Sequence, residues 1–228
     1  MTVASAKPWV VVAAYNEARM IGSVVTGLRE AGYPVVVVDD GSSDATSKLA
    51  ETAGARVVRH PINLGQGAAL QTGIEFALEL GAQIVVTFDA DGQHRVDDIA
   101  ALSDALVTHK ANFALGSRVL GQAIDAPPSR RLLLKLATWF TRLNTGMHVT
   151  DTHNGLRAMT RRGALAIRLR QNRMAHASEL LQQIADSGLK YVEVPVTIQY
   201  SEYSLAKGQS FGDALSILVD LIARKVHR

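Results

Sequence analysis

Short, continuous apolar runs alternate with segments of helical length through the first half of the chain, and this rhythm constrains the fold more than any other feature. The apolar runs predict five strands, at residues 9–13, 35–38, 56–58, 84–88 and 113–115. Helices are predicted at residues 17–31, from the capping segment 42–44 onward, and at 65–80 and 96–108. Strands that are apolar along their whole length and separated by helices are typical of a parallel sheet covered on both faces. The sequence therefore predicts an α/β, doubly wound domain with a mostly parallel sheet.

The rhythm changes after residue 117. The pattern predicts a Gly- and Pro-bearing loop at 121–128, a basic amphipathic helix at 130–143, a short strand at 156–159, helices at 161–169 and 175–187, a strand at 191–199 and a last helix at 211–226. No internal repeat separates the two halves. We expect one domain, residues 1–228, in which an α+β extension (118–228) continues the first half (1–117).

Composition narrows the classes of function. The chain has 228 residues, no Cys, and a net charge of +3 from 24 Lys and Arg against 21 Asp and Glu. Lack of Cys excludes disulfides, thiolate metal sites and cysteine nucleophiles, and the small charge surplus does not indicate nucleic acid. No apolar stretch reaches the ~18 residues of a membrane-spanning helix, and the N-terminal run makes a poor signal peptide. We expect a cytoplasmic protein, soluble or peripheral to a membrane.

Polar residues gather where four of the predicted strands end. These clusters are Ala14-Tyr15-Asn16-Glu17, Asp39-Asp40-Gly41-Ser42-Ser43-Asp44, Asp89-Ala90-Asp91-Gly92-Gln93-His94 and Gly116-Ser117-Arg118. Ligands of open parallel sheets bind beyond the carboxyl ends of the strands, so the convergence predicts a site at that edge. Neither G-x-G-x-x-G after the first strand nor a P-loop occurs, which disfavours a dinucleotide dehydrogenase and a P-loop NTPase.

Asp89-Ala90-Asp91 is the sharpest of these signals. Alternating carboxylates at a strand end can both reach one hard cation, and Gln93 is spaced to lend a third oxygen. Oxygen ligands fit Mg²⁺ or Mn²⁺, ions that complete their shell with phosphate oxygens. The alternative is an Asp-rich turn that caps the next helix, but the neighbouring polar clusters favour the metal. We expect His94 to orient this loop without binding the ion.

Together these motifs resemble the family 2 glycosyltransferases of the GT-A fold, in particular the polyprenyl-phosphate sugar synthases related to dolichol-phosphate mannosyltransferase. The segments that carry the resemblance occur in family order and cover nearly the whole chain: residues 11–17, 37–46, 63–69, 88–94, 116–118, 151–157 and 192–196. The implied fold is a Rossmann-like, mostly parallel sheet with an acceptor-side extension. The motifs are specific for the family and say little about the sugar.

The resemblance implies a role for each matching residue. The nucleotide-sugar would be held by Ala13, Tyr15, Glu17, Asp39, Asp40, Gln66, Asp89, Ala90, Asp91 and Lys207. The metal that bridges its diphosphate would be held by Asp89, Asp91 and Gln93. Arg118, Arg130 and Asn154 would bind the acceptor or the sugar's phosphate, and Asp151 and Asn154 would line the sugar pocket.

A few positions depart from the family pattern. Ala14 stands where Pro is usual, Gln66 where Lys is common, and Arg95 where Pro usually follows Gln-His. Leu134 replaces the serine four residues after the helix arginine, Arg130. None of these changes removes a metal ligand.

The chemistry of sugar transfer assigns the catalytic candidates. Charge develops on the leaving phosphate, where a divalent ion and Lys207 would neutralise it, and direct displacement inverts the anomeric carbon. Asp91 and Arg118 are candidates for this catalysis. A phosphate acceptor needs no strong base, whereas a hydroxyl acceptor does, and Asp151 and Glu179 are then the candidates. For Glu179 a capping or ion-pairing role in its helix is an equal alternative.

Two helices bear on membrane binding. Helix 130–143 combines Arg and Lys with Leu, Trp and Phe, as interfacial helices do. Segment 211–226 is apolar and leads into the basic end Arg224-Lys225-Val226-His227-Arg228, which suits anionic headgroups. The alternatives are packing on the core, a homo-oligomer surface or an integral membrane partner.

Three functions follow from this sequence. The first is metal-dependent transfer of a sugar from a nucleotide-sugar to a polyprenyl phosphate at the cytoplasmic face of the membrane. The second keeps the donor and uses a saccharide hydroxyl as acceptor, as in surface polysaccharide assembly. The third is a non-catalytic nucleotide-sugar-binding scaffold.

Overall fold

The computed structural model describes residues 7–124, 138–139, 141–143, 145–171 and 175–200, and its centre is one seven-stranded sheet. The strands are β1 (Trp9–Ala14), β2 (Val35–Asp39), β3 (Arg56–Arg59), β4 (Ile84–Asp89), β5 (Phe113–Ile124), β6 (Arg157–Thr160) and β7 (Tyr191–Gln199). Their order across the sheet is β3-β2-β1-β4-β6-β5-β7. Only β6 runs antiparallel to its neighbours, β4 and β5. The predicted α/β fold with a mostly parallel sheet is confirmed.

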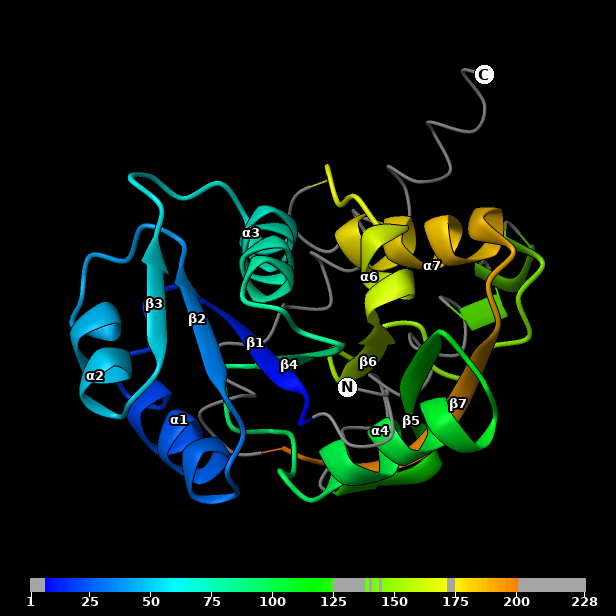
Figure 1. Ribbon diagram of the computed structural model, residues 1–228, viewed down its shortest axis with the longest axis horizontal. Coiled ribbons are helices and arrows are strands. Elements are labelled where there is room, and N and C mark those ends of the chain that lie inside the picture. The colour runs from blue at the N-terminus through cyan, green and yellow to red at the C-terminus, as the bar shows by residue number, and fades with distance from the viewer. Residues whose placement is uncertain (1–6, 125–137, 140, 144, 172–174, 201–228) are drawn as a thin grey trace.

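Helices cover both faces of the sheet (Figure 1). On one side lie α1 (Ile21–Glu30), α2 (Thr46–Thr52) and α4 (Asp98–Thr108), and on the other α3 (Gln66–Glu79), α6 (Arg161–Leu165) and α7 (Ala175–Ser187). Along β1, Val10 and Val12 pack into the first core, and Val11 between them packs into the second. Because each strand is buried on both faces, it needs apolar residues at successive positions, which explains the unbroken valine runs.

The first two helices begin later than predicted. Residues 17–20 form a turn in which Met20 N and Ile21 N both donate to the carbonyl of Glu17, so α1 starts at Ile21. The N-cap position of α2 is Ala45, but Asp44 supplies the capping oxygen, since its Oδ1 accepts from Thr46 N at 3.0 Å. In addition Ser42 Oγ accepts from Asn16 N, and Asp44 Oδ2 accepts from Ala18 N. These polar side chains tie the loop after β2 to the loop after β1.

The predicted loop at 121–128 is wrong in its first part, because β5 extends to Ile124. Its pairing with β7 shifts register between Ser117 and Gln122, which is a bulge. A Cβ on Gly121 would lie 2.6 Å from Val196 N, so only glycine allows the two strands to pair this closely here. A glycine inside a strand marks such a bulge as readily as a loop.

Candidate active site

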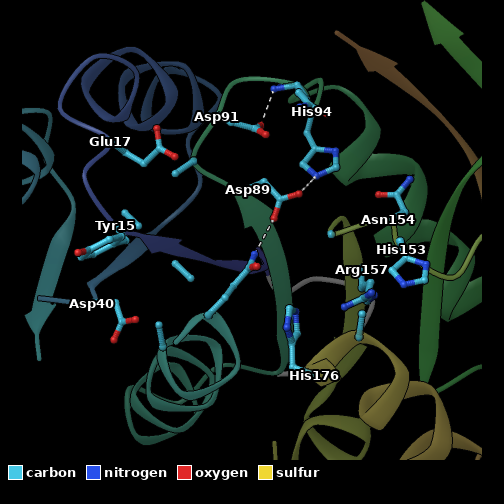
Figure 2. Close-up of a pocket in the computed structure, with 18 of the residues that line it drawn as sticks. Tyr15, Glu17, Asp40, Asp89, Asp91, His94, His153, Asn154, Arg157 and His176 are labelled. Carbon is cyan, nitrogen blue, oxygen red and sulfur yellow. Dashed lines mark hydrogen bonds and ion pairs between the residues drawn. The ribbon is translucent and has the colours of Figure 1, made fainter. Parts of the chain in front are cut away.

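A cleft of about 450 Å³ opens along the carboxyl edge of the sheet (Figure 2). Strand order decides which residues meet there: the ends of β2 and β1 lie on one side, β4 in the middle, and β6 and β5 on the other. The cleft is lined by most of the predicted residues, namely Ala13, Tyr15, Glu17, Asp40, Gln66, Asp89, Ala90, Asp91, Gln93, Arg118 and Asn154.

Asp40 closes the β2 side of the cleft. Its carboxylate accepts from Leu64 N at 2.9 Å and Gly65 N at 2.7 Å, and His60 Nδ1 lies 2.8 Å away. The carboxylate thus anchors the loop that leads into α3. On the same side of the cleft, Tyr15 is 45% exposed.

Asp39 does not reach the cleft, although it was predicted beside Asp40. Its Oδ1 accepts from Ser42 N at 2.8 Å and its Oδ2 bonds Ser47 Oγ, with Arg59 Nε 3.7 Å away. Successive side chains of a strand point to opposite faces, so the two neighbours diverge. Asp39 holds the loop between β2 and α2.

Asp89 and Asp91 stand at the end of β4 in the middle of the cleft. His94 Nε2 lies 2.8 Å from Asp89 Oδ2, and Asp91 Oδ1 accepts from Gln93 N at 3.0 Å. Burial alone would raise the pKa of Asp89, but the charge and hydrogen bond of His94, with Arg157 and His176, lower it. Burial and the neighbouring Asp89 raise the pKa of Asp91 to about 6. Neighbouring carboxylates repel each other, and a divalent cation bound between them would relieve that repulsion.

The two aspartates fit a metal ion whose coordination shell is completed by oxygens of the substrate. Among the described residues no three His, Cys, Asp or Glu side chains gather into a ready-made site. Mg²⁺ in proteins is held through one or two carboxylates together with substrate phosphates, so a pair of aspartates suffices. Gln93 lines the cleft, and its carbonyl accepts from Gln199 N at 3.0 Å, which fixes its loop to the end of β7.

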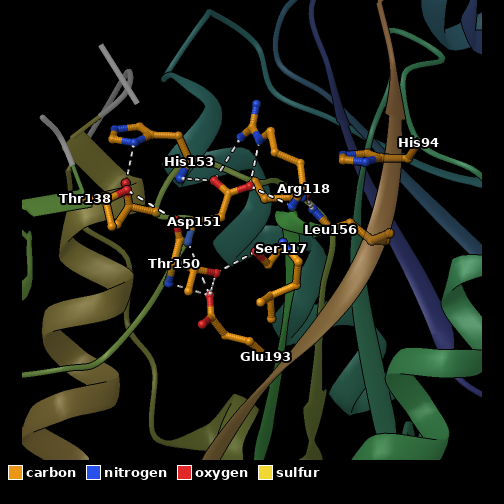
Figure 3. A network of polar contacts seen from close by, with 12 residues as sticks. His94, Ser117, Arg118, Thr138, Thr150, Asp151, His153, Leu156 and Glu193 are labelled. Atoms are coloured by element: carbon orange, nitrogen blue, oxygen red, sulfur yellow. Dashed lines mark hydrogen bonds and ion pairs between the residues drawn. The ribbon is translucent and has the colours of Figure 1, made fainter. Parts of the chain in front are cut away.

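Arg118 lines the cleft, but most of its guanidinium is bound to other side chains (Figure 3). Its Nε donates to Asp151 Oδ2 at 2.6 Å, its Nη2 to Oδ1 at 3.1 Å, and its Nη1 to Tyr200 Oη at 2.8 Å. Burial would raise the pKa of Asp151, but the charge of Arg118 and the bonds from it hold that pKa below its usual range. Asp151 is buried and does not line the cleft. It therefore lies where it can pair with Arg118 and not in the predicted sugar pocket.

Glu193 on β7 supports this pair from below. Its carboxylate accepts from Thr150 N at 2.8 Å, Thr150 Oγ1 at 2.9 Å and Asp151 N at 3.2 Å (Figure 3). Ser117 Oγ lies 2.6 Å from Thr150 Oγ1. The resemblance included the motif 192–196 without assigning it a role, and the geometry gives Glu193 the role of fixing the Asp151 loop.

Glu179 also lies away from the cleft. Its carboxylate accepts from Arg170 N at 2.9 Å and Gln171 N at 2.8 Å, and from Gln183 Nε2 at 3.2 Å. These bonds hold the loop between α6 and α7, so the two backbone groups that Glu179 binds lie outside its own helix.

His153, Arg157 and His176 line the cleft although the sequence analysis gave them no role there. His176 is buried and reaches the cleft from α7. Burial lowers the pKa of His153 to about 4, so that its ring is neutral at physiological pH. Arg157 begins β6, and the antiparallel direction of that strand brings its first residue to the carboxyl edge. The motif 151–157 contained the signal for Arg157, but not the direction of the strand.

Comparison with known proteins gives this geometry a family. Residues 9–167 match the sequence model of the family described as Glycosyl transferase family 2. The chain belongs to this family. It is 32% identical over 240 residues to UDP-N-acetylglucosamine–dolichyl-phosphate N-acetylglucosaminyltransferase of Methanococcus voltae, covering 96% of each protein. It is 31% identical over 211 residues to polyprenol monophosphomannose synthase of Mycolicibacterium smegmatis, covering 87% of this chain and 79% of the relative.

Solved structures support the fold of this family 2 glycosyltransferase. Glucosyl-3-phosphoglycerate synthase from Mycobacterium tuberculosis, in complex with Mn²⁺ and UDP-glucose, superimposes with a TM-score of 0.74 at 20% identity and covers 98% of this chain and 83% of its own. The predicted GT-A fold is thereby confirmed, and the chain is a glycosyltransferase.

Several predictions of the glycosyltransferase site lie outside the described residues. These are Arg130, Lys207, segment 211–226 and the larger part of helix 130–143. Within that helix Trp139 and Leu143 are described, and each is more than 60% exposed. Among the helices that the structure describes, none has the length and apolar character to cross a membrane.

Proposed function

We propose that this glycosyltransferase moves a sugar from a nucleotide-sugar to a polyprenyl phosphate, with a divalent ion, at the cytoplasmic face of the membrane. One observation carries the proposal: the carboxylates of Asp89 and Asp91 lie in the middle of the cleft, between Tyr15 and Asp40 on one side and Asn154 and Arg157 on the other. A donor laid along that line has its nucleoside at β1 and β2, its diphosphate at the aspartates and its sugar toward β6.

The reaction is one displacement at the anomeric carbon. An oxygen of the acceptor phosphate forms a bond to that carbon, while the bond from the carbon to the diphosphate oxygen breaks and its electron pair leaves with the nucleoside diphosphate. Asp89, Asp91 and Gln93 would hold Mg²⁺ or Mn²⁺, which would supply positive charge for the leaving diphosphate. Asp40 and Glu17 hold the nucleoside, and the small side chains Ala13 and Ala90 leave it room. His94 orients Asp89.

The two side chains that the sequence offered as bases for a hydroxyl acceptor are bound to other groups of the protein. A hydroxyl acceptor needs a base that removes its proton. The carboxylate of Asp151 is engaged by Arg118, and that of Glu179 by the backbone of Arg170 and Gln171. A phosphate is already ionised at neutral pH and needs no base, so a phosphate acceptor is favoured over a saccharide hydroxyl. The relatives named for dolichyl phosphate and polyprenol monophosphomannose support the same acceptor class.

Membrane association is part of the proposal. Trp139 and Leu143 are large, exposed apolar side chains, and the sequence 130–143 around them also contains Arg and Lys. Such a helix binds at an interface through its apolar face and its basic residues.

The test is transfer from a panel of labelled nucleotide-sugars to a short polyprenyl phosphate, with Mg²⁺ or Mn²⁺. Asp91→Ala and a sample treated with EDTA run in parallel. We expect a lipid-linked product that both controls abolish, and the panel then names the donor. Transfer to a saccharide with no lipid product would refute the acceptor, and nucleotide-sugar turnover that survives EDTA would refute the metal.

A further inference from the structure

Arg157 is a buried cation of the cleft with which no described side chain forms an ion pair. It is 4% exposed and lines the cleft, yet its guanidinium makes no hydrogen bond or ion pair with any described residue. Burial lowers its pKa despite the attraction of Asp89 and Asp151. Arg118 contrasts with it, because Asp151 and Tyr200 satisfy that side chain. A buried charge without a partner costs free energy, so a site that retains one is set up to receive the opposite charge.

The register of the sheet fixes where Arg157 stands. It pairs with Thr87 on β4, two residues before Asp89, and with Leu115 on β5, three residues before Arg118. It therefore lies on the far side of the aspartates from Tyr15 and Asp40, as Figure 2 shows. The nucleoside and the diphosphate of a donor occupy the other side and the middle, so an anion that meets Arg157 comes from the acceptor.

A second donor group without a partner lies in the same part of the cleft. Asn154 Oδ1 accepts from Leu156 N at 2.9 Å, but the buried Nδ2 of Asn154 has no partner among the described residues. Nδ2 can only donate a hydrogen bond. Phosphate offers acceptor oxygens alone when it is ionised, and a guanidinium binds two of them at once.

From these three observations we propose that Arg157, with Asn154 beside it, binds the phosphate of the acceptor and holds one of its oxygens toward the anomeric carbon. This rests on the proposed function and moves the acceptor's main cation from Arg118, whose charge is matched within the protein, to Arg157. Arg118 then has a structural role in the lining of the cleft, where it is bound to Asp151 and Tyr200.

The experiment compares wild type with Arg157→Gln, Arg157→Lys and the control Arg162→Gln, which changes an exposed arginine of α6 outside the cleft. Calorimetry measures binding of three probes with Mg²⁺ present: UDP or GDP, whichever wild type binds; a water-soluble short-chain prenyl phosphate; and inorganic phosphate. The Tm of each variant is recorded without ligand.

We expect Arg157→Gln to weaken binding of the prenyl phosphate at least tenfold and binding of the nucleoside diphosphate less than threefold, since a charge-assisted bond is worth roughly that much. Arg157→Lys retains part of the affinity, and Arg162→Gln retains all of it. In transfer assays Arg157→Gln raises the KM of the acceptor and leaves the KM of the donor unchanged. The Tm of Arg157→Gln stays level or rises, because an uncompensated buried charge is removed; a purely structural arginine would lower it.

The outcomes separate this inference from the proposed function. Wild type that binds prenyl phosphate as tightly as Arg157→Gln does refutes the role of Arg157 and leaves the acceptor class standing. An equal loss for the nucleoside diphosphate refutes it too and assigns Arg157 to the donor. Binding of inorganic phosphate that depends on Arg157, without any binding of the prenyl phosphate, supports the anion subsite and refutes the lipid acceptor. Wild type that binds neither phosphate refutes both.

Discussion

Replacing Gly155 by alanine tests whether the exact position of Asp89 matters to catalysis. A Cβ at residue 155 would lie 2.5 Å from Asp89 Cγ and closer still to both carboxylate oxygens, whereas an ordinary contact is 3.4–4 Å. The residue has no positive φ, so the obstacle is steric and not conformational. Gly155 is held in place because Thr87 Oγ1 donates to its carbonyl at 2.6 Å. The Asp89 carboxylate must therefore give way by about 1 Å, at the cost of its bond with His94.

The size of the effect follows from that displacement. A 1 Å error in a catalytic group costs roughly 100-fold in rate, and overpacking costs ~1–3 kcal/mol of stability. We expect Gly155→Ala to lower kcat/KM about 100-fold and to require more Mg²⁺ or Mn²⁺ for half-maximal rate. For a chain of this size the Tm falls by roughly 2–4 °C per kcal/mol, so activity is measured well below the transition.

Gly22→Ala is the matched control. Gly22 lies in α1 with nothing within 4 Å of an added Cβ, so this change leaves activity intact and does not lower the Tm. If Gly155→Ala retained activity within threefold of wild type at ordinary metal concentration, Asp89 would not need the position that the cleft gives it. The metal assignment would then lose its geometric basis.

Three further predictions use other parts of the site. Asp91→Asn removes one of two repelling carboxylates, so we expect a higher Tm in metal-free protein together with transfer reduced at least 100-fold; a lower Tm would contradict the repulsion. Asp151→Asn leaves Arg118 buried without its counter-charge and costs about 3–5 kcal/mol in urea unfolding. Because the folded-state pKa of Asp151 is depressed, its stabilisation is present at neutral pH and is lost as pH falls through that pKa, so the Tm gap between wild type and variant narrows on acidification and does not widen. Gly67→Ala drives a methyl group against Gln171 O and to 2.8 Å from His176 Cβ, so we expect a lower Tm and weaker donor binding as α3 and α7 separate, with Gly22→Ala again as control.

The middle of the cleft could be predicted from sequence because its information is local. Five unbroken apolar runs fix the strands, and polar residues directly after them must meet at one edge. Asp89 and Asp91 needed no knowledge of the second half of the chain. The same reasoning placed Asp39 and Asp40 together, although the alternation of side chains along β2 separates them, and only Asp40 lines the cleft. A stricter use of the two-residue period would have favoured one of the pair, without saying which.

The far side of the cleft could not be predicted in this way, because it depends on how β6 enters the sheet. A four-residue strand gives no direction, and a parallel β6 would carry Arg157 to the opposite edge. The extension of β5 to Ile124 was hidden for a related reason: Gly121 is required by the backbone of Val196, 75 positions away, and not by a local turn. Long-range pairing decides both features.

Long-range pairing also explains why motifs that resemble ligand-binding signatures contain residues that bind one another. Arg118 of the motif 116–118 and Asp151 of the motif 151–157 bind each other, and Glu193 of the motif 192–196 fixes the backbone of Asp151. Three separate motifs thus contribute one residue each to a network that no substrate needs to touch. Among the described residues outside that network, the pKa of Asp91 stays raised, the buried His94 Nδ1 and Asn154 Nδ2 have no hydrogen-bond partner, and Arg157 has no ion pair. We propose that Asp91 serves the metal and that Asn154 and Arg157 serve the acceptor. In a buried polar site, the residues that the protein does not satisfy are the better guide to its substrates.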